Sequence, residues 1–142
     1  MLFLFLPKST QAFWNAPSAK ADLLVIPETV TEIGNQAFRW CGAIRNVRVN
    51  STTLNLGCQA FLLTTGRNGY IDLSAVKNLT MAKETDDTNT FFTFGGISTI
   101  YVADDSIAAM MNDGVNYPNT FDKAKTSIIS VNGGAVSENP TG

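Results

Sequence analysis

The 142-residue chain contains no histidine, and this absence narrows the chemistry open to it. Histidine is the commonest general base and a frequent metal ligand in proteins. Hydrolases that pair a serine or cysteine nucleophile with histidine are therefore excluded. No two carboxylates are placed convincingly for acid–base catalysis either. We expect a protein that is not an enzyme and that carries neither a cofactor nor a metal site.

Charge is scarce as well, since Asp, Glu, Lys and Arg make up only 15% of the residues. The ten Lys and Arg residues do not cluster, whereas a nucleic-acid interface needs a basic face. We therefore expect no nucleic-acid partner. Low charge combined with many Ser, Thr, Asn and Gly residues favours a protein rich in strands and turns rather than helices.

Long apolar runs are missing too. The opening "MLFLFL" ends at Pro7, which is shorter than the ~7–15 apolar residues of a secretory signal and far below the ~18 of a membrane helix. We expect no membrane span and no export signal in these residues. The two cysteines, Cys41 and Cys58, are too few for a disulfide scaffold, and we expect two free thiols with Cys41 buried.

The chain does contain a repeat. The tripeptide Gln-Ala-Phe occurs three times, and its phenylalanines Phe13, Phe38 and Phe61 are 25 and 23 residues apart. Short strand-like runs recur at a similar period. These runs cover residues 3–6, 23–26, 46–49, 70–73 and 99–102, with a sixth candidate at 127–131. Two markers with one period predict stacked coils, in which neighbours bury the apolar face that a single coil cannot bury alone.

Alignment of the runs assigns each residue a place in the coil. Alternate residues of a strand point to the same side, so each strand supplies two inward positions. The inward residues are Leu24, Val47, Ile71 and Ile100 at the first position, and Ile26, Val49, Leu73 and Val102 at the second. Gly34 and Gly57 share a corner position, where tolerance of positive φ suits a sharp turn. The phenylalanine four residues later is expected to fill the far wall.

The stretch "LLVIPETVTEIGNQAFRWCGAIRNVRV", residues 23–49, resembles the BspA-like leucine-rich repeat family of bacterial surface proteins. The matching elements are Ile26-Pro27, Val30-Thr31, Ile33-Gly34, Ala37-Phe38, Cys41, Ile44 and the strand 47–49. The next repeat matches through Leu56-Gly57 and Ala60-Phe61 and then drifts. The resemblance covers residues 1 to about 131. It implies a solenoid that serves adhesion or protein binding in an extracellular or cell-surface setting.

The segment "ISTIYVADDSIAAMMNDG" resembles the closing unit of such arrays, in which a strand leads into a short capping helix. Asp104 or Asp105 is expected to cap a helix over residues 106–112, and Gly114 to end it. The predicted fold is thus a β-rich solenoid, a leucine-rich-repeat-type right-handed array of about five coils with a C-terminal helical cap. The repeat domain is expected to cover residues 1–131, with the capping unit from about residue 103. Residues 132–142 are expected to form a flexible tail.

One residue of each strand lies between the two inward positions and is expected to face outward. These residues are Phe5, Val25, Arg48, Asp72 and Tyr101. Stacking places them in a row at intervals of ~4.8 Å, and solenoids use such faces for binding. Arg and Tyr are typical residues of interaction hot spots. We predict a binding surface here, although every sheet has an outer face and the row is also consistent with a purely structural role.

Two further features leave their role open. Trp40 is expected either to be exposed as a binding aromatic or to pack over the edge of the coil. The acidic segment "ETDDTNT", residues 84–90, offers oxygen ligands for a hard cation but lacks the spacing of a calcium loop. We expect a solvated loop there.

The N-terminal edge is the last candidate site. Phe3, Leu4, Phe5 and Leu6 are expected to form the first strand of the stack. An apolar edge strand leaves backbone groups unpaired and invites strand addition by another chain. The alternative is that the short first coil caps itself with Trp14.

Two function hypotheses therefore stand. One is an adhesion or protein-interaction module that binds a protein partner or a host-surface ligand through the strand face. The other is a structural component of a larger assembly, such as a bacteriophage virion, which docks or self-associates through the N-terminal edge.

Overall fold

The computed structural model describes eight stretches of the chain. They are residues 2–3 (backbone only), 22–35, 37–38, 44–61, 69–82, 93–117, 120–121 and 124–134. Several sites expected from the sequence lie outside these stretches. They are Leu4, Phe5, Leu6, Phe13, Trp14, Trp40, Cys41, the acidic segment 84–90 and residues 135–142 of the expected tail.

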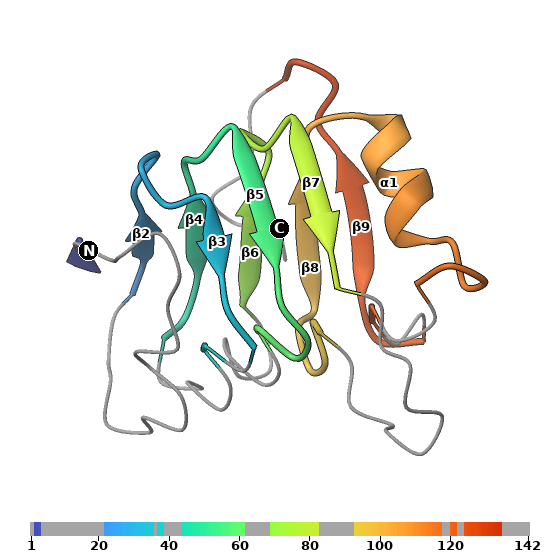
Figure 1. Ribbon diagram of the computed structural model, residues 1–142, viewed down its shortest axis with the longest axis horizontal. Coiled ribbons are helices and arrows are strands. Elements are labelled where there is room, and N and C mark those ends of the chain that lie inside the picture. The colour runs from blue at the N-terminus through green and yellow to red at the C-terminus, as the bar shows by residue number, and fades with distance from the viewer. Residues whose placement is uncertain are drawn as a thin grey trace.

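The described residues form nine strands and one helix, arranged as two parallel sheets that face each other (Figure 1). The strands are β1 (Leu2–Phe3), β2 (Leu24–Ile26), β3 (Glu32–Ile33), β4 (Val47–Val49), β5 (Thr53–Leu56), β6 (Tyr70–Leu73), β7 (Asn78–Met81), β8 (Thr99–Val102) and β9 (Ser127–Ser130). The helix is α1 (Asp105–Met111). One sheet has the order β1-β2-β4-β6-β8-β9 and the other the order β3-β5-β7.

The chain winds as a β-solenoid of about three turns, which confirms the predicted fold class. In each full turn a strand of the six-stranded sheet is followed by a strand of the three-stranded sheet, as in β2–β3, β4–β5 and β6–β7. The coil count expected from the sequence, about five, is too high. One reason is that β8 leads into α1 rather than into a second-wall strand, so a count of first-wall strands exceeds the number of complete turns. The remainder of the first expected coil, residues 4–21, lies outside the described stretches.

The interior follows the alignment of the repeats. Leu24 pairs in register with Val47, Val47 with Ile71, and Ile71 with Ile100, and all four are fully buried. The residues of the second inward position are buried as well. Repeated aliphatic residues at one height thus build a continuous core between the two sheets, as expected when neighbouring coils bury each other.

Phenylalanines fill the far end of this core. The rings of Phe38 and Phe61 stack with centroids 5.5 Å apart, and Phe61 stacks in turn on Phe94 at 5.6 Å. The backbone joins the same coils, because Phe38 N–H donates to the Ala60 carbonyl at 2.9 Å and Phe61 N–H to the Thr93 carbonyl at 2.9 Å. The expectation that Phe38 and Phe61 fill the far wall is confirmed.

Gly57 occupies a corner of the coil for a reason other than the expected one. Its φ is not positive, so a left-handed turn does not require glycine there. A Cβ at this position would instead lie 2.5 Å from the Asn35 nitrogen and 2.7 Å from the Gly34 carbonyl carbon. Glycine therefore permits the close approach of one coil to the next.

Helix α1 closes the C-terminal end of the sheet beside β9 (Figure 1). Asp104 is its N-cap, one of the two candidates, and its Oδ1 accepts the Ile107 N–H at 3.0 Å. The helix ends at Met111 with Asn112 as its C-cap, so Gly114 lies beyond the cap and does not end the helix. The Asn112 backbone and side-chain N–H groups both donate to the Ala108 carbonyl. Within the described ranges there is no helix of the length and apolarity that a membrane crossing requires.

The first strand pairs in a register different from the one expected. Strand β1 places Phe3 opposite Val25, whereas the repeat alignment places Phe5 there. The opening residues alternate leucine and phenylalanine, so a shift of two residues leaves the same side chain types on each face. The sequence pattern therefore could not distinguish the two registers.

Candidate functional site

The six-stranded sheet has an inner face, which packs on the core, and an outer face, here called the strand face. Four of the five residues expected there form one row across neighbouring strands. Val25 pairs with Arg48, Arg48 with Asp72, and Asp72 with Tyr101, and the row continues to Ile129 on β9. We call Val25, Arg48, Asp72 and Tyr101 the outward row.

Most of the outward row is buried, contrary to the expectation of an open surface. Val25 is 3% exposed, and Asp72 and Tyr101 are each 4% exposed. The Arg48 side chain remains 33% exposed, and Ile129 is 41% exposed. Of the outward row, Arg48 is thus the residue available to a molecule in solution.

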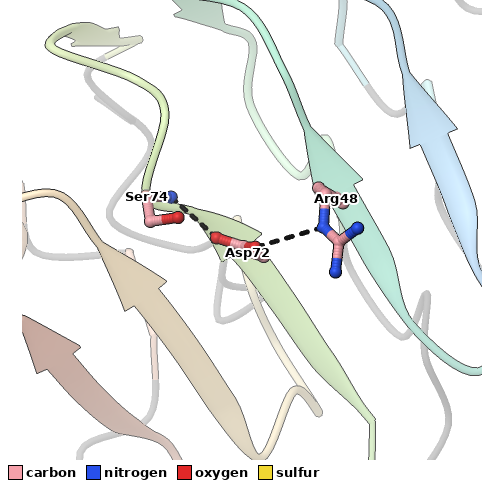
Figure 2. Close-up of polar contacts among 3 residues, drawn as sticks. All are labelled: Arg48, Asp72 and Ser74. Atoms are coloured by element: carbon pink, nitrogen blue, oxygen red, sulfur yellow. Dashed lines mark hydrogen bonds and ion pairs between the residues drawn. The ribbon is translucent and has the colours of Figure 1, made fainter. Parts of the chain in front are cut away.

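An ion pair lies at the centre of the row (Figure 2). Arg48 Nε lies 3.4 Å from Asp72 Oδ2, and the Ser74 backbone N–H donates to Asp72 Oδ1 at 2.8 Å. The two side chains meet because they occupy the same height on adjacent parallel strands, β4 and β6. The Ser74 amide fixes one carboxylate oxygen and leaves the other directed at the guanidinium.

Two tyrosines extend this polar centre. Tyr70 lies two residues before Asp72 and so shares its side of β6, where it is 3% exposed. Its ring meets that of Tyr101 edge to face, with centroids 5.7 Å apart and planes at 76°. Burial raises the pKa of Tyr101, and the nearby Tyr70 and Asp72 raise it further. Sequence reasoning missed Tyr70, although its two-residue spacing from Asp72 is the signal for it.

A hollow of about 320 Å³ opens beside the ion pair. It is called the strand-face hollow and is lined by Arg48, Val49, Asn50, Asp72, Ser74, Ala75 and Gly134. Most of these residues come from the carboxyl ends of β4 and β6 and the turns that follow them. Gly134 comes from the far end of the described chain, beyond β9.

A second, larger hollow of about 620 Å³ lies on the three-stranded sheet. Its exposed row consists of Glu32, Asn55 and Thr80, which pair in register on β3, β5 and β7. The sequence reasoning did not single out this row. This surface is polar and its lining contains no aromatic residue, whereas the strand face combines an ion pair with two tyrosines.

The remaining candidate chemistry is sparse. Cys58 is half-buried, and its backbone N–H donates to Asn35 Oδ1 at 2.9 Å. Among the described residues, no three acidic or cysteine side chains gather as ligands for a metal ion. No protein-family model, curated protein or solved structure matches this chain.

Proposed function

We propose that the chain is a non-enzymatic protein-interaction module whose contact surface is the strand face around Arg48. The observation that carries the proposal is the Arg48–Asp72 pair beside the strand-face hollow. Asp72 holds the guanidinium on the sheet while a third of the Arg48 side chain stays accessible. An arginine positioned in this way recognises a carboxylate of a partner with little further loss of side-chain entropy.

The neighbouring residues suit the same role. Tyr70 and Tyr101 form an almost fully buried aromatic contact next to Asp72, which supports the sheet around the ion pair. Arginine is among the residues that contribute most binding energy at protein interfaces. The resemblance of residues 23–49 to BspA-like leucine-rich repeats supports an adhesive role in an extracellular or cell-surface setting, with a protein or host-surface ligand as the partner.

Site-specific photo-cross-linking tests the location of the contact. A photoreactive residue placed at Arg48 is compared with one at Asn55, which is exposed on the opposite sheet. We expect position 48 to cross-link a partner protein from cells or host material and position 55 to cross-link little of it. Equal cross-linking at both positions, or cross-linking from position 55 alone, would place the contact elsewhere.

A second candidate function rests on β1. This strand is the last of the six-stranded sheet and pairs, among the described strands, with β2 alone. Strand addition at such an edge would make the chain a structural component of a larger assembly, such as a virion, or a self-associating unit. Sedimentation of the full chain and of a variant without residues 1–6 distinguishes the two candidates. A stable oligomer that the deletion dissociates favours edge docking, and a monomer in both cases favours the strand face.

A further inference from the structure

The turn that follows β9 is built around Asn132 and Gly133. These two residues adopt left-handed φ angles of 48° and 86°, and the Gly134 N–H donates to the Val131 carbonyl at 2.8 Å. Positive φ at both central residues, with a hydrogen bond across the turn, is typical of a type I′ turn. Such turns favour asparagine followed by glycine, so the backbone conformation accounts for both residues. The turn also leaves both of them exposed to solvent.

The same two residues bring a reactive set of atoms together. The backbone nitrogen that follows an asparagine can attack the side-chain Cγ, because the ring that closes has five members. A side chain on the following residue hinders this attack, and glycine has none. A Cβ placed on Gly133 would meet no atom of the described residues within 4 Å, its chain neighbours aside, so the space around it is open. Asparagine is accordingly one of the thermolabile residues of proteins.

The turn after α1, with Asp113 followed by Gly114, offers a contrast. Asp113 Oδ1 accepts the backbone N–H groups of Val115 and Asn116, and Asp113 Oδ2 accepts the Asn116 side-chain amide at 2.7 Å. These hydrogen bonds hold the carboxylate in one orientation. An ionised carboxylate is also a poorer electrophile than an amide. The pair after β9 is therefore the more reactive of the two.

The Asn132 side chain also joins two elements of the C-terminal cap. Its Nδ2 donates to Asp105 Oδ1, in the first turn of α1, at 3.3 Å. This distance is beyond the usual ~2.7–3.2 Å, so the contact restrains the amide only weakly. The Asn132 backbone N–H donates to the Ala103 carbonyl at 3.0 Å. Asn132 thus ties the end of β9 to the start of α1 and to the segment before it.

We propose that Asn132 is a site of spontaneous deamidation. The Gly133 nitrogen bonds to Cγ of Asn132, the bond between Cγ and Nδ2 breaks, and Nδ2 leaves as ammonia with the proton that the Gly133 nitrogen loses. Water then opens the succinimide ring at one of its two carbonyl carbons. Opening at Cγ yields aspartate. Opening at the main-chain carbonyl carbon yields isoaspartate, in which the main chain runs through the former side chain. The reaction does not depend on the function proposed above.

Either product weakens the link between β9 and α1. Aspartate places a carboxylate where the Asn132 amide faced Asp105, so a hydrogen bond becomes a repulsion between like charges. Isoaspartate adds one carbon to the main chain inside the turn, so the hydrogen bond between Val131 and Gly134 cannot keep its geometry. The deamidated chain therefore holds its C-terminal cap less tightly than the original chain.

Peptide mapping tests the modification in the folded chain. Trypsin cleaves after Lys125, so residues 126–142 form one peptide, in which Asn139 cannot form the ring because Pro140 has no N–H. We expect the intact chain, incubated at neutral or alkaline pH before digestion, to yield aspartate and isoaspartate forms of this peptide. Conversion should accelerate in proportion to the hydroxide concentration, because the attacking nitrogen must lose its proton. A peptide that stays unmodified at alkaline pH, or fragment masses that exclude Asn132, would overturn the proposal.

Hydrogen exchange tests the effect on the cap. Asn132→Asp reproduces one product, and Asn78→Asp makes the same change in charge at an exposed position of β7, where the Thr53 hydroxyl can donate to the new carboxylate. We expect Asn132→Asp to lower the exchange protection of amides 131 and 132 severalfold, and Asn78→Asp to leave it unchanged. Unchanged protection in Asn132→Asp, or an equal loss in both variants, would show that the cap does not depend on this amide.

Discussion

Phe38 and Phe61 stack with their ring planes only 6° from parallel, one coil above the other. Each ring belongs to a copy of the Gln-Ala-Phe tripeptide, so the repeat in the sequence becomes a column of rings in the fold. Phe94 extends the column without that tripeptide. The repeat therefore exists because each coil needs one large apolar residue at the same place in its interior.

The middle ring of the column contributes most to its packing. Phe61→Ala removes a fully buried ring that contacts rings on both sides, and we expect a loss of ~3–5 kcal/mol in the free energy of unfolding. Val115→Ala, at a residue that is 90% exposed, is the control and should change stability by less than ~0.5 kcal/mol. Urea denaturation measures both. A loss below ~1 kcal/mol for Phe61→Ala would contradict the stacked core.

Gly57 should tolerate no side chain. The Cβ of Gly57→Ala would meet backbone atoms of Gly34 and Asn35 in the neighbouring coil, so the coils must separate, at a cost of ~1–3 kcal/mol. Thermal denaturation followed by circular dichroism measures the effect, with Thr80→Ala at an exposed strand position as the control. An unchanged melting temperature for Gly57→Ala would show that the coils are not so closely packed.

The ion pair on the strand face should show energetic coupling. A double-mutant cycle with Arg48→Met and Asp72→Asn isolates the interaction between the two side chains from their other contacts. We expect a coupling of ~0.5–1.5 kcal/mol, because Asp72 is buried while Arg48 is partly screened by solvent. Additive single-variant effects would mean that the 3.4 Å contact is not maintained in solution.

The cap of α1 should make stability depend on pH in the acidic range. Hydrogen bonds from the Ser106 side chain and the Ile107 N–H lower the pKa of Asp104 in the folded chain. The Asp104 carboxylate therefore stabilises the fold fully at pH values above its pKa in the unfolded chain, about 4. This stabilisation is lost as the pH falls through the lower pKa that Asp104 has in the folded chain. We expect Asp104→Ala to lower the melting temperature at pH 7 and to do so less at pH 2.5.

Asp104→Asn is the matched variant for this test. Asparagine is also a good N-cap but does not titrate, so it should retain most of the melting temperature at pH 7 without the acid dependence. If wild type and Asp104→Asn lose stability in parallel on acidification, the carboxylate is not the source of the pH dependence.

The strands and the core were predictable because one physical rule determines both. Aliphatic residues alternate with other residues along each strand, so the pattern identified the paired positions of Leu24, Val47, Ile71 and Ile100. The same rule fails where the alternation is degenerate. In the opening leucine–phenylalanine run every two-residue shift is equivalent, and the register was misplaced by two residues.

The other differences have separate causes. Phe94 was missed because its coil lacks the Gln-Ala-Phe tripeptide and is irregular in length. The burial of Asp72 and Tyr101 was missed because alternation shows which side a residue faces but not what lies on that side. That burial depends on contacts between segments distant in sequence, which no local pattern encodes.

The most direct test of the account is the affinity of the partner recovered by cross-linking, measured by calorimetry with matched arginine variants. Arg48→Ala removes the accessible guanidinium of the strand face, and Arg45→Ala removes an equal charge from an exposed position just before β4. We expect the dissociation constant to be at least tenfold higher for Arg48→Ala, a loss of about 1.4 kcal/mol in binding free energy. For Arg45→Ala we expect the dissociation constant to change less than twofold. Equal affinities for wild type and Arg48→Ala would contradict binding through the strand face.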